Sequence, residues 1–149
     1  MATSNRTDAA ALSRTIDFRG FISHLDRATG DGRMNRARAL LREERFILSH
    51  ETSDEHVGGV VLDNATPPRR HACRIDNDGR YMCCTEDLEP CAQQEGKPCE
   101  HLLGLVLLLV QVGIVDASSL SGWIRRTEGK APSLDQAAMT AAFARCKDA

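Results

Sequence analysis

The sequence has few aromatic residues. Aromatic side chains make up 4% of its 149 residues, with one Trp, one Tyr and four Phe. Aliphatic side chains must therefore fill most of the interior, and few large rings remain to anchor a binding interface. Hydrophobic residues are nevertheless 42% of the chain and charged residues 27%, as in folded globular proteins rather than disordered ones. We expect an ordinary globular fold with a thin core.

Long apolar segments are also lacking. The longest, from Leu102 to Val110, has nine residues, whereas a membrane-spanning helix needs roughly 20. The first residues are small and polar and do not form the apolar stretch of a secretory signal. We therefore expect residues 1–14 to be disordered and residues 15–149 to form a single domain. We also expect a cytoplasmic protein that does not bind a membrane.

Neither sign of charge dominates the whole chain, whose net charge is −2, but the charges are unevenly distributed. Residues 1–50 carry nine basic and six acidic side chains, residues 51–101 carry five and eleven, and residues 102–149 carry five and four. Nucleic-acid binding depends mostly on neutralising phosphates, so the acidic middle segment disfavours a nucleic-acid surface there. A basic face would have to come from Arg125 and Arg126 or from an earlier group of five: Arg33, Arg36, Arg38, Arg42 and Arg45.

The spacing of apolar residues predicts helices at both ends of the chain and short strands between them. Helices are predicted over residues 15–28 and 33–44, the second with its arginines exposed. Strands are predicted near residues 46–48, 57–62, 71–75 and 80–83, with a turn at Asp78-Gly79 joining the last two. Later helices are predicted at 99–112, at 116–126, and from a capping box at Ser133 and Gln136 through residue 145. The predicted fold is α+β, a small antiparallel β-meander flanked by N- and C-terminal helices.

Cysteine is the informative residue type. Six cysteines are present, and four of them lie with one histidine between residues 83 and 101. Disulfides usually spread more widely, and a chain without an export signal is expected in a reducing compartment, so metal binding is the better interpretation. Zinc prefers four Cys or His ligands in a tetrahedron. We expect four of these five residues to bind Zn²⁺: Cys83, Cys84, Cys91, Cys99 and His101.

Backbone geometry narrows this set. Cys99 and His101 are two residues apart and would not face the same way within a regular helix, so Cys99 must lie at or before the first turn. Pro98 suits such a start, and the helix dipole would stabilise a thiolate there. Cys83 and Cys84 would point to opposite faces of a continuous strand, so we expect one of the pair, which the sequence leaves open, to join Cys91.

Two stretches of this cluster follow a known pattern: Tyr81-Met82-Cys83-Cys84-Thr85 and Pro98-Cys99-Glu100-His101-Leu102-Leu103-Gly104-Leu105. With these residues the chain resembles a SWIM zinc finger. That family has a Cys-x-Cys pair, a variable loop, and a Cys-x-His pair that opens a hydrophobic helix. The likeness covers roughly residues 33–113, with the finger at about 71–113. It departs from the pattern in the first pair, where Met82 or Thr85 stands in place of a ligand, and Cys91 is the natural replacement. The likeness extends upstream, because the lead-in from Arg36 to Leu41 is similar to that of bacterial members.

The resemblance implies a zinc module that recognises protein or DNA. Some bacterial SWIM proteins work with ATPase and von Willebrand-type partners in multi-component systems. The acidic charge of the zinc-bearing segment favours a protein partner, and the alternative is a nucleic-acid binder that uses the arginine face at residues 33–45. No membrane partner is expected.

Catalysis is disfavoured. A metal with four protein ligands has no open position for water. The His-x-Glu and Pro-Cys-x-x-Cys pairs of zinc deaminases are absent, and Cys99 and His101 are too close in sequence to act as nucleophile and base. We therefore expect a protein that is not an enzyme.

The remaining cysteines and histidines are expected to have structural roles. Cys73 and Cys146 are predicted to be small buried side chains. Three histidines, His24, His50 and His56, have no cysteine at ligand spacing and are predicted to be ordinary surface or core residues. His71 is predicted likewise, but it is the one of these histidines with a cysteine at ligand spacing, Cys73, and that pair is the exception to watch.

Overall fold

The computed structural model describes residues 17–43, 45–92, 94 and 97–147, and these form five helices and four strands. The predicted α+β class is confirmed, whereas the segment predicted to be disordered, residues 1–14, lies outside the described residues. In chain order the elements are α2 (Phe18–Thr29), α3 (Arg33–Leu40), β1 (Ile47–Thr52), β2 (His56–Leu62), β3 (Arg70–Asp76), β4 (Tyr81–Thr85), α4 (Glu100–Gln111), α5 (Ala117–Arg126) and α6 (Gln136–Lys147).

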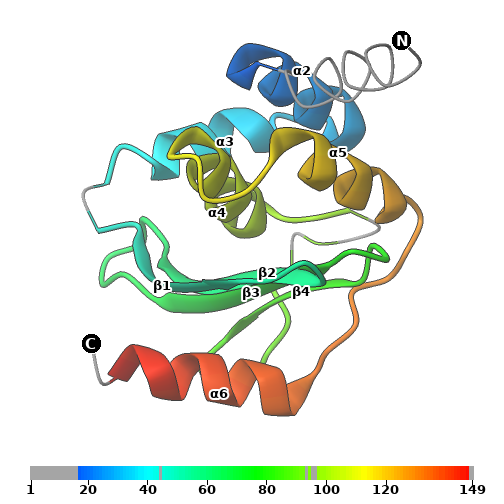
Figure 1. The fold of residues 1–149 in the computed structure, drawn as a ribbon. Helices are drawn as coiled ribbons and strands as arrows, with labels where there is room; N and C mark the ends of the chain where they lie inside the picture. Colours follow the sequence, from blue (N-terminus) through cyan, green and yellow to red (C-terminus); the bar gives the residue numbers. More distant parts are fainter. Residues whose placement is uncertain (1–16, 44, 93, 95–96, 148–149) are drawn as a thin grey trace, which may run out of the picture.

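The sheet lies between two helical layers. Its strands are antiparallel in the order β1-β2-β3-β4, the predicted meander. Helices α2 to α5 lie over one face, and of the described elements only α6 lies across the other (Figure 1). The sequence did not predict that the last helix would cross to the opposite face. Because both faces are covered, β2 is buried along its length from Val57 to Val61.

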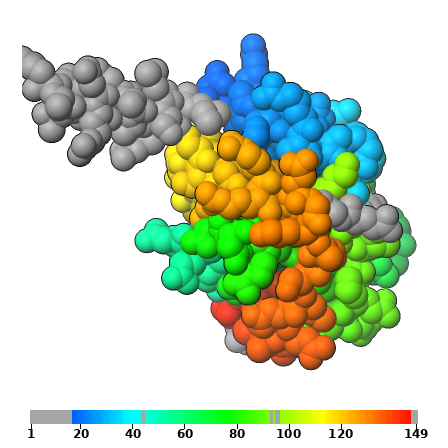
Figure 2. Space-filling model, turned by 90° about the vertical axis from the view of Figure 1, so that its right-hand side faces the viewer, coloured from blue at the N-terminus to red at the C-terminus, as the bar shows by residue number. Residues whose placement is uncertain are grey.

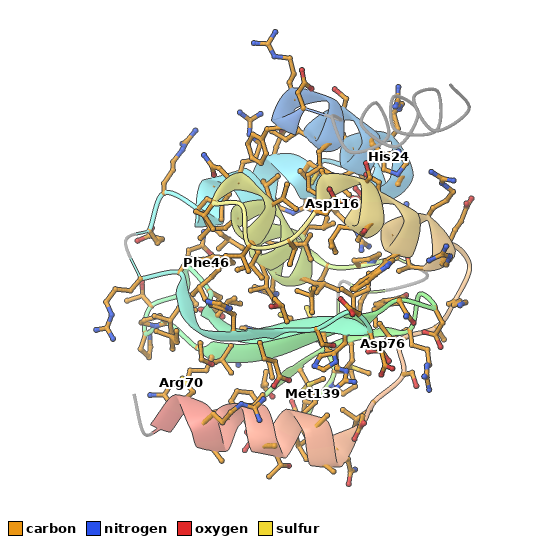
Figure 3. All side chains as sticks on the ribbon, viewed as in Figure 1. His24, Phe46, Arg70, Asp76, Asp116 and Met139 are labelled. Atoms are coloured by element: carbon orange, nitrogen blue, oxygen red, sulfur yellow. The ribbon has the colours of Figure 1, made fainter. Side chains whose placement is uncertain are left out.

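Each face of the sheet has its own hydrophobic core. The larger core joins α2 to α5 to the sheet and contains the apolar residues of α4. The smaller core packs Met139, Phe143 and Cys146 of α6 against the sheet. Phe46 lies on the α4 side of the sheet and Met139 on the α6 side (Figure 3). Helix α4 approaches closely because residue 104 is glycine: a Cβ there would lie 2.8 Å from the ring of Phe46.

The connection between α5 and α6, residues 127–135, runs down one side of the molecule across the sheet (Figure 2). Tyr81 holds it, since its hydroxyl donates to the Lys130 carbonyl at 2.6 Å and its own carbonyl accepts from the Ser133 N–H at 2.9 Å. Ser133 was predicted to cap α6, but that prediction is wrong. Asp135 is the capping residue, with its carboxylate accepting the Ala138 N–H at 3.0 Å.

The hairpin between β3 and β4 forms at the predicted turn. Gly79 has φ +94°, which few other residues adopt, and a Cβ there would also collide with the backbone of Arg126. Arg126 in turn donates to the Asn77 carbonyl at 2.7 Å. The turn is thereby tied to the end of α5.

Helix α3 is shorter than predicted and ends at Leu40. Its first residue was predicted to be exposed, but Arg33 is 7% exposed, because its side chain turns inward toward the segment before α4. None of the helices in the described part of the chain has the length and apolarity needed to cross a bilayer.

Candidate metal centre

Strand β4 decides which of the two adjacent cysteines reaches the cluster. Cys83 and Cys84 are both fully buried, but they lie in different cores. Cys83 points toward α4, and Cys84 points toward α6, as the alternation of side chains along a strand requires. Of the five predicted candidates, Cys84 is therefore the one that the structure does not bring to the cluster.

Cys91 is brought in by a loop that folds back along β4. Its N–H donates to the Cys83 carbonyl at 2.8 Å. Gln94 continues this contact: its side-chain amide donates to the Cys83 carbonyl at 2.7 Å and accepts the Cys83 N–H at 2.9 Å. Both backbone groups of Cys83 are therefore occupied by the loop, which fixes Cys91 beside Cys83.

Cys99 and His101 are held at the start of α4. Cys99 occupies the N-cap position in an extended conformation, with φ −80° and ψ 173°, so it lies before the first turn as predicted. Its carbonyl accepts the first helical hydrogen bond, from Leu103 N–H at 3.0 Å. His101 lies inside that first turn. The two side chains can therefore converge although they are two residues apart.

Arg33 fixes the segment in front of Cys99. Its guanidinium Nη1 donates to the Pro98 carbonyl at 2.8 Å and to the Lys97 carbonyl at 3.0 Å. Its Nε lies 3.2 Å from the Asp31 carboxylate. Sequence reasoning placed Arg33 on a basic surface and missed this role, because a contact across more than sixty residues leaves no periodic signal.

The four side chains converge to a spacing that suits a metal ion. The Nδ1 atom of His101 lies 3.8 Å from Cys83 Sγ, 3.7 Å from Cys91 Sγ and 3.7 Å from Cys99 Sγ. All four donor atoms lie within 4.8 Å of one another. In a tetrahedral zinc site, bond lengths of about 2.3 Å to sulfur and about 2.0 Å to nitrogen put donor atoms roughly 3.5–3.8 Å apart. The residues present therefore fit a Cys₃His metal centre.

Burial determines the protonation of these thiols. It raises the pKa of Cys83 and of Cys99 well above the usual value, because a thiolate in the core loses its hydration. Burial therefore opposes the effect that the sequence predicts for the start of α4, which favours a thiolate at Cys99. Since metal ligation needs thiolates, an ion that binds here must displace protons.

His71 supports the cluster from β3. The sequence marked its spacing to Cys73 as notable but predicted an ordinary surface or core histidine. Its ring stacks on that of His101, with centroids 3.9 Å apart and planes 12° from parallel. Its Nε2 lies 3.0 Å from the Asp63 carboxylate, and its Nδ1 lies 3.7 Å from Cys83 Sγ. A signal existed in the register, since His71 lies two residues from Cys73, which pairs with Cys83 across the sheet. His71 and Cys83 therefore share a face.

The charges around His71 are consistent with a supporting role. Burial lowers the pKa of His71, and the neighbouring His101 ring lowers it further, so the neutral ring is favoured. Burial alone would raise the pKa of Asp63, but hydrogen bonds from the Arg69 and Ala65 amides and from His71 hold it below its usual value. The ionised carboxylate thus orients a neutral ring.

Asp63, His71 and His101 also bring donor atoms within 4.8 Å of one another. The two imidazoles are stacked, however, so their nitrogen lone pairs lie in nearly parallel planes and do not converge on one point. We therefore interpret Asp63 and His71 as residues that orient His101, as carboxylates and other partners commonly do for metal-bound histidine.

A surface hollow of about 410 Å³ opens beside the cluster and is lined in part by Asp63, His71, Cys91 and His101. Cys91 is partly exposed, whereas Cys83, Cys99 and His101 are buried. The cluster therefore meets solvent on the Cys91 side.

The two cysteines predicted to be structural are buried, and their surroundings differ. Cys146 lies on α6 and packs in the smaller core between that helix and the sheet. Cys73 is 2% exposed, and its Sγ lies 3.7 Å from Cys83 Sγ, directly beside the cluster but outside the group of four.

Comparison of the chain with protein-family models, with curated proteins and with solved structures returned no match. Interpretation of the centre therefore depends on its own geometry.

Proposed function

We propose that this chain is a non-catalytic zinc-binding module in which one ion joins β4 and its following loop to the start of α4. The observation that carries the proposal is the convergence of Cys83, Cys91, Cys99 and His101 at donor spacings of a tetrahedral site. Three thiolates and one imidazole are ligands typical of structural zinc and unlike the oxygen ligands that magnesium or calcium prefers.

The proposal is non-catalytic because four protein ligands fill the coordination of zinc. Catalytic zinc usually keeps three protein ligands and one open position for water. The buried positions of Cys83, Cys99 and His101 support a closed site. In this function the ion contributes stability to the fold and fixes the surface around Cys91 and the start of α4.

Metal analysis of two matched variants tests the site. Cys83 and Cys84 are neighbours on β4, are both fully buried, and face opposite cores. We expect elemental mass spectrometry to find stoichiometric zinc in the purified wild-type protein. Cys83→Ser should contain no zinc, and Cys84→Ser should keep it. Equal zinc contents in the two variants, or none in the wild type, would refute the site.

We further propose that the module recognises a protein partner. Residues 51–101 are strongly acidic, and two arginines of the supposed basic face are engaged within the molecule. Arg33 is buried, and Arg36 forms ion pairs with Glu100 at 3.4 Å and Asp31 at 3.7 Å. Arg38, Arg42 and Arg45 remain exposed. The SWIM relationship, the ATPase and von Willebrand-type partners and the cytoplasmic location stay predictions from the sequence.

A gel-shift series over ionic strength separates this proposal from the nucleic-acid alternative. Salt cations compete with arginine for the phosphates, so the affinity of a nucleic-acid binder declines steeply as salt is added. We expect only weak binding at low salt and no difference between wild type and a variant carrying Arg38→Glu, Arg42→Glu and Arg45→Glu. Tight, salt-sensitive binding that the triple variant abolishes would favour the nucleic-acid alternative instead.

A further inference from the structure

Cys73 is a buried thiol in contact with a member of the metal cluster. It lies on β3 directly opposite Cys83 on β4. The two sulfur atoms are 3.7 Å apart, and both cysteines are thiols in the structure. The group of four mutually close donor atoms does not include Cys73. A metal held by that group would leave the Cys73 thiol uncoordinated and next to a ligand.

The backbone at this pair is arranged so that a disulfide can form. The N–H and carbonyl of Cys83 are both directed to Gln94 and Cys91, on the side away from β3. Cys73 and Cys83 therefore form a non-hydrogen-bonded pair, in which the Cα atoms of antiparallel strands approach to about 4.5 Å. Disulfides span Cα distances of about 4.4–6.8 Å. Rotation of the two side chains brings the sulfurs together without movement of the strands.

We propose that Cys73 and Cys83 form a reversible disulfide. Its formation takes the ligand Cys83 away from the metal, and the metal ion is then released. This inference rests on the proposed zinc function. Oxidation would leave Cys91, Cys99 and His101, three ligands in place of four. Cys73 is then a resolving cysteine, which explains why a fourth thiol contacts the cluster without joining it.

The chemistry requires a two-electron oxidant, and a peroxide suffices. Cys91 is the partly exposed thiol on the hollow, so it reacts first. Its thiolate attacks one peroxide oxygen, breaks the O–O bond, and gives a sulfenic acid and hydroxide. Cys83 Sγ lies within 4.8 Å of Cys91 Sγ and displaces a second hydroxide, forming a Cys83–Cys91 disulfide.

Cys73 then completes the exchange. Its thiolate attacks Cys83 Sγ, forms the Cys73–Cys83 bond and expels Cys91 as a thiolate. The net reaction oxidises the Cys73 thiol and the zinc-bound Cys83 thiolate to one disulfide and reduces one hydrogen peroxide to two molecules of water. One hydroxide takes up the Cys73 thiol proton and the other takes a proton from solvent. A dithiol reductant reverses it.

Peroxide treatment of the zinc-loaded protein tests the proposal. Zinc release is followed with a chromophoric chelator, free thiols are alkylated, and disulfides are located by peptide mass spectrometry. We expect loss of zinc together with a Cys73–Cys83 disulfide, and recovery of zinc binding after dithiothreitol and added zinc. A disulfide confined to Cys83, Cys91 and Cys99 in the wild type would overturn the proposal.

Substitution of Cys73 supplies the matched control. Cys73→Ala should bind zinc before oxidation and release it with peroxide, but its disulfide should join Cys83 to Cys91, and excess peroxide should convert more of Cys91 to sulfinic acid, which the reductant does not reverse. Cys146→Ala removes a cysteine buried far from the cluster and should behave as wild type. If Cys73→Ala does not fold, Cys73→Val serves in its place. A Cys83–Cys91 disulfide in the wild type as abundant as in the Cys73 variant would refute a resolving role.

The zinc content measured before peroxide is added separates the two proposals. If the untreated protein neither contains nor takes up zinc, the zinc function fails. The disulfide is then judged by mapping in the same metal-free protein. If zinc is present and peroxide yields no Cys73–Cys83 bond, the disulfide proposal alone fails.

Discussion

At the scale of single residues, His71 shows how a side chain outside the group of four can control it. Its ring covers one face of His101, and Asp63 anchors the opposite edge through Nε2. Without this stack, the His101 ring would be free to turn its Nδ1 away from the three sulfurs. The arrangement resembles the outer-shell partners that set the orientation of metal-bound histidines.

We predict that His71→Ala lowers zinc affinity by roughly 10–100-fold without abolishing binding, the range typical of outer-shell changes. Affinity is measured by competition with a chromophoric chelator. His50→Ala, which changes an exposed histidine on β1, is the control and should leave affinity unchanged. His71→Phe keeps a stacked ring but cannot bond to Asp63, so affinity near that of wild type would assign the effect to stacking. Unaltered affinity in His71→Ala would contradict a positioning role.

Cys84, which lies outside the cluster, should make the unfolding free energy depend on pH in the alkaline range. Burial raises its pKa from 9.0 to about 11. Above pH 9 the unfolded chain releases this proton first, so the native state is stabilised below pH 9 and loses that contribution as pH rises toward 11. We predict that wild type loses more unfolding free energy than Cys84→Ala over this range, as measured by urea denaturation. Parallel declines in the two proteins would show that the thiol does not contribute.

At the scale of elements, the link between α3 and α4 is a contact that holds Cys99 in place. Arg33 satisfies the carbonyls of Lys97 and Pro98, and no backbone donor does so in the described part of the chain. A buried carbonyl left without its partner costs about 1–3 kcal/mol. The position of the first helical turn of α4 thus depends on a residue more than sixty positions earlier.

We predict that Arg33→Leu lowers the unfolding free energy by about 2–4 kcal/mol, since it leaves two carbonyls without a charged donor, and also weakens zinc binding. Arg38→Leu is the matched control, because Arg38 is exposed on the same helix and should change stability by less than about 0.5 kcal/mol. Denaturant unfolding and zinc competition measure the two effects. A similar loss in both variants would indicate helix propensity rather than the contact.

Local patterns predicted most of the elements. The Asp78-Gly79 turn, the four strands and α4 follow from backbone requirements and apolar runs that the sequence contains directly. The position of α6 does not, because its apolar residues fit any uncovered surface. The continuous apolar stretch in β2, at Val57 to Val61, was nevertheless a sign that both faces of the sheet are buried.

The site was partly predictable for a related reason. Cysteine spacing identified the five candidates, but alternation along β4 could not decide between Cys83 and Cys84 while the face that meets α4 was unknown. His71 and Cys73 reach the cluster through cross-strand pairing with β4, and Arg33 reaches it through a contact distant in sequence. Such relationships depend on strand register and tertiary packing, which the local patterns of a sequence do not reveal.

At the scale of the whole molecule, the proposed metal lies where separate parts of the larger core meet. Cys83 comes from the sheet, Cys91 from the loop beyond it, and Cys99 and His101 from the start of the central helix. The smaller core under α6 shares none of these four residues. Removal of the metal should therefore affect the two sides of the sheet differently.

We predict that chelation lowers the thermal midpoint by roughly 8–16 °C relative to protein with free zinc near 1,000 times its dissociation constant. Such binding stabilises the native state by about 4 kcal/mol, and about 1 kcal/mol shifts the midpoint of a domain this size by about 2–4 °C. Cys83→Ser should show no zinc-dependent shift of the thermal midpoint.

On removal of zinc, hydrogen exchange should become faster at the amides of Cys91 and Leu103, whose acceptors are the carbonyls of Cys83 and Cys99. The Met139 amide of α6 should change less, because its acceptor, Asp135, lies outside the cluster. Uniform loss of protection across both cores would mean that the ion supports the whole fold as one cooperative unit. An unchanged thermal midpoint on removal of bound zinc would refute the structural role of the ion.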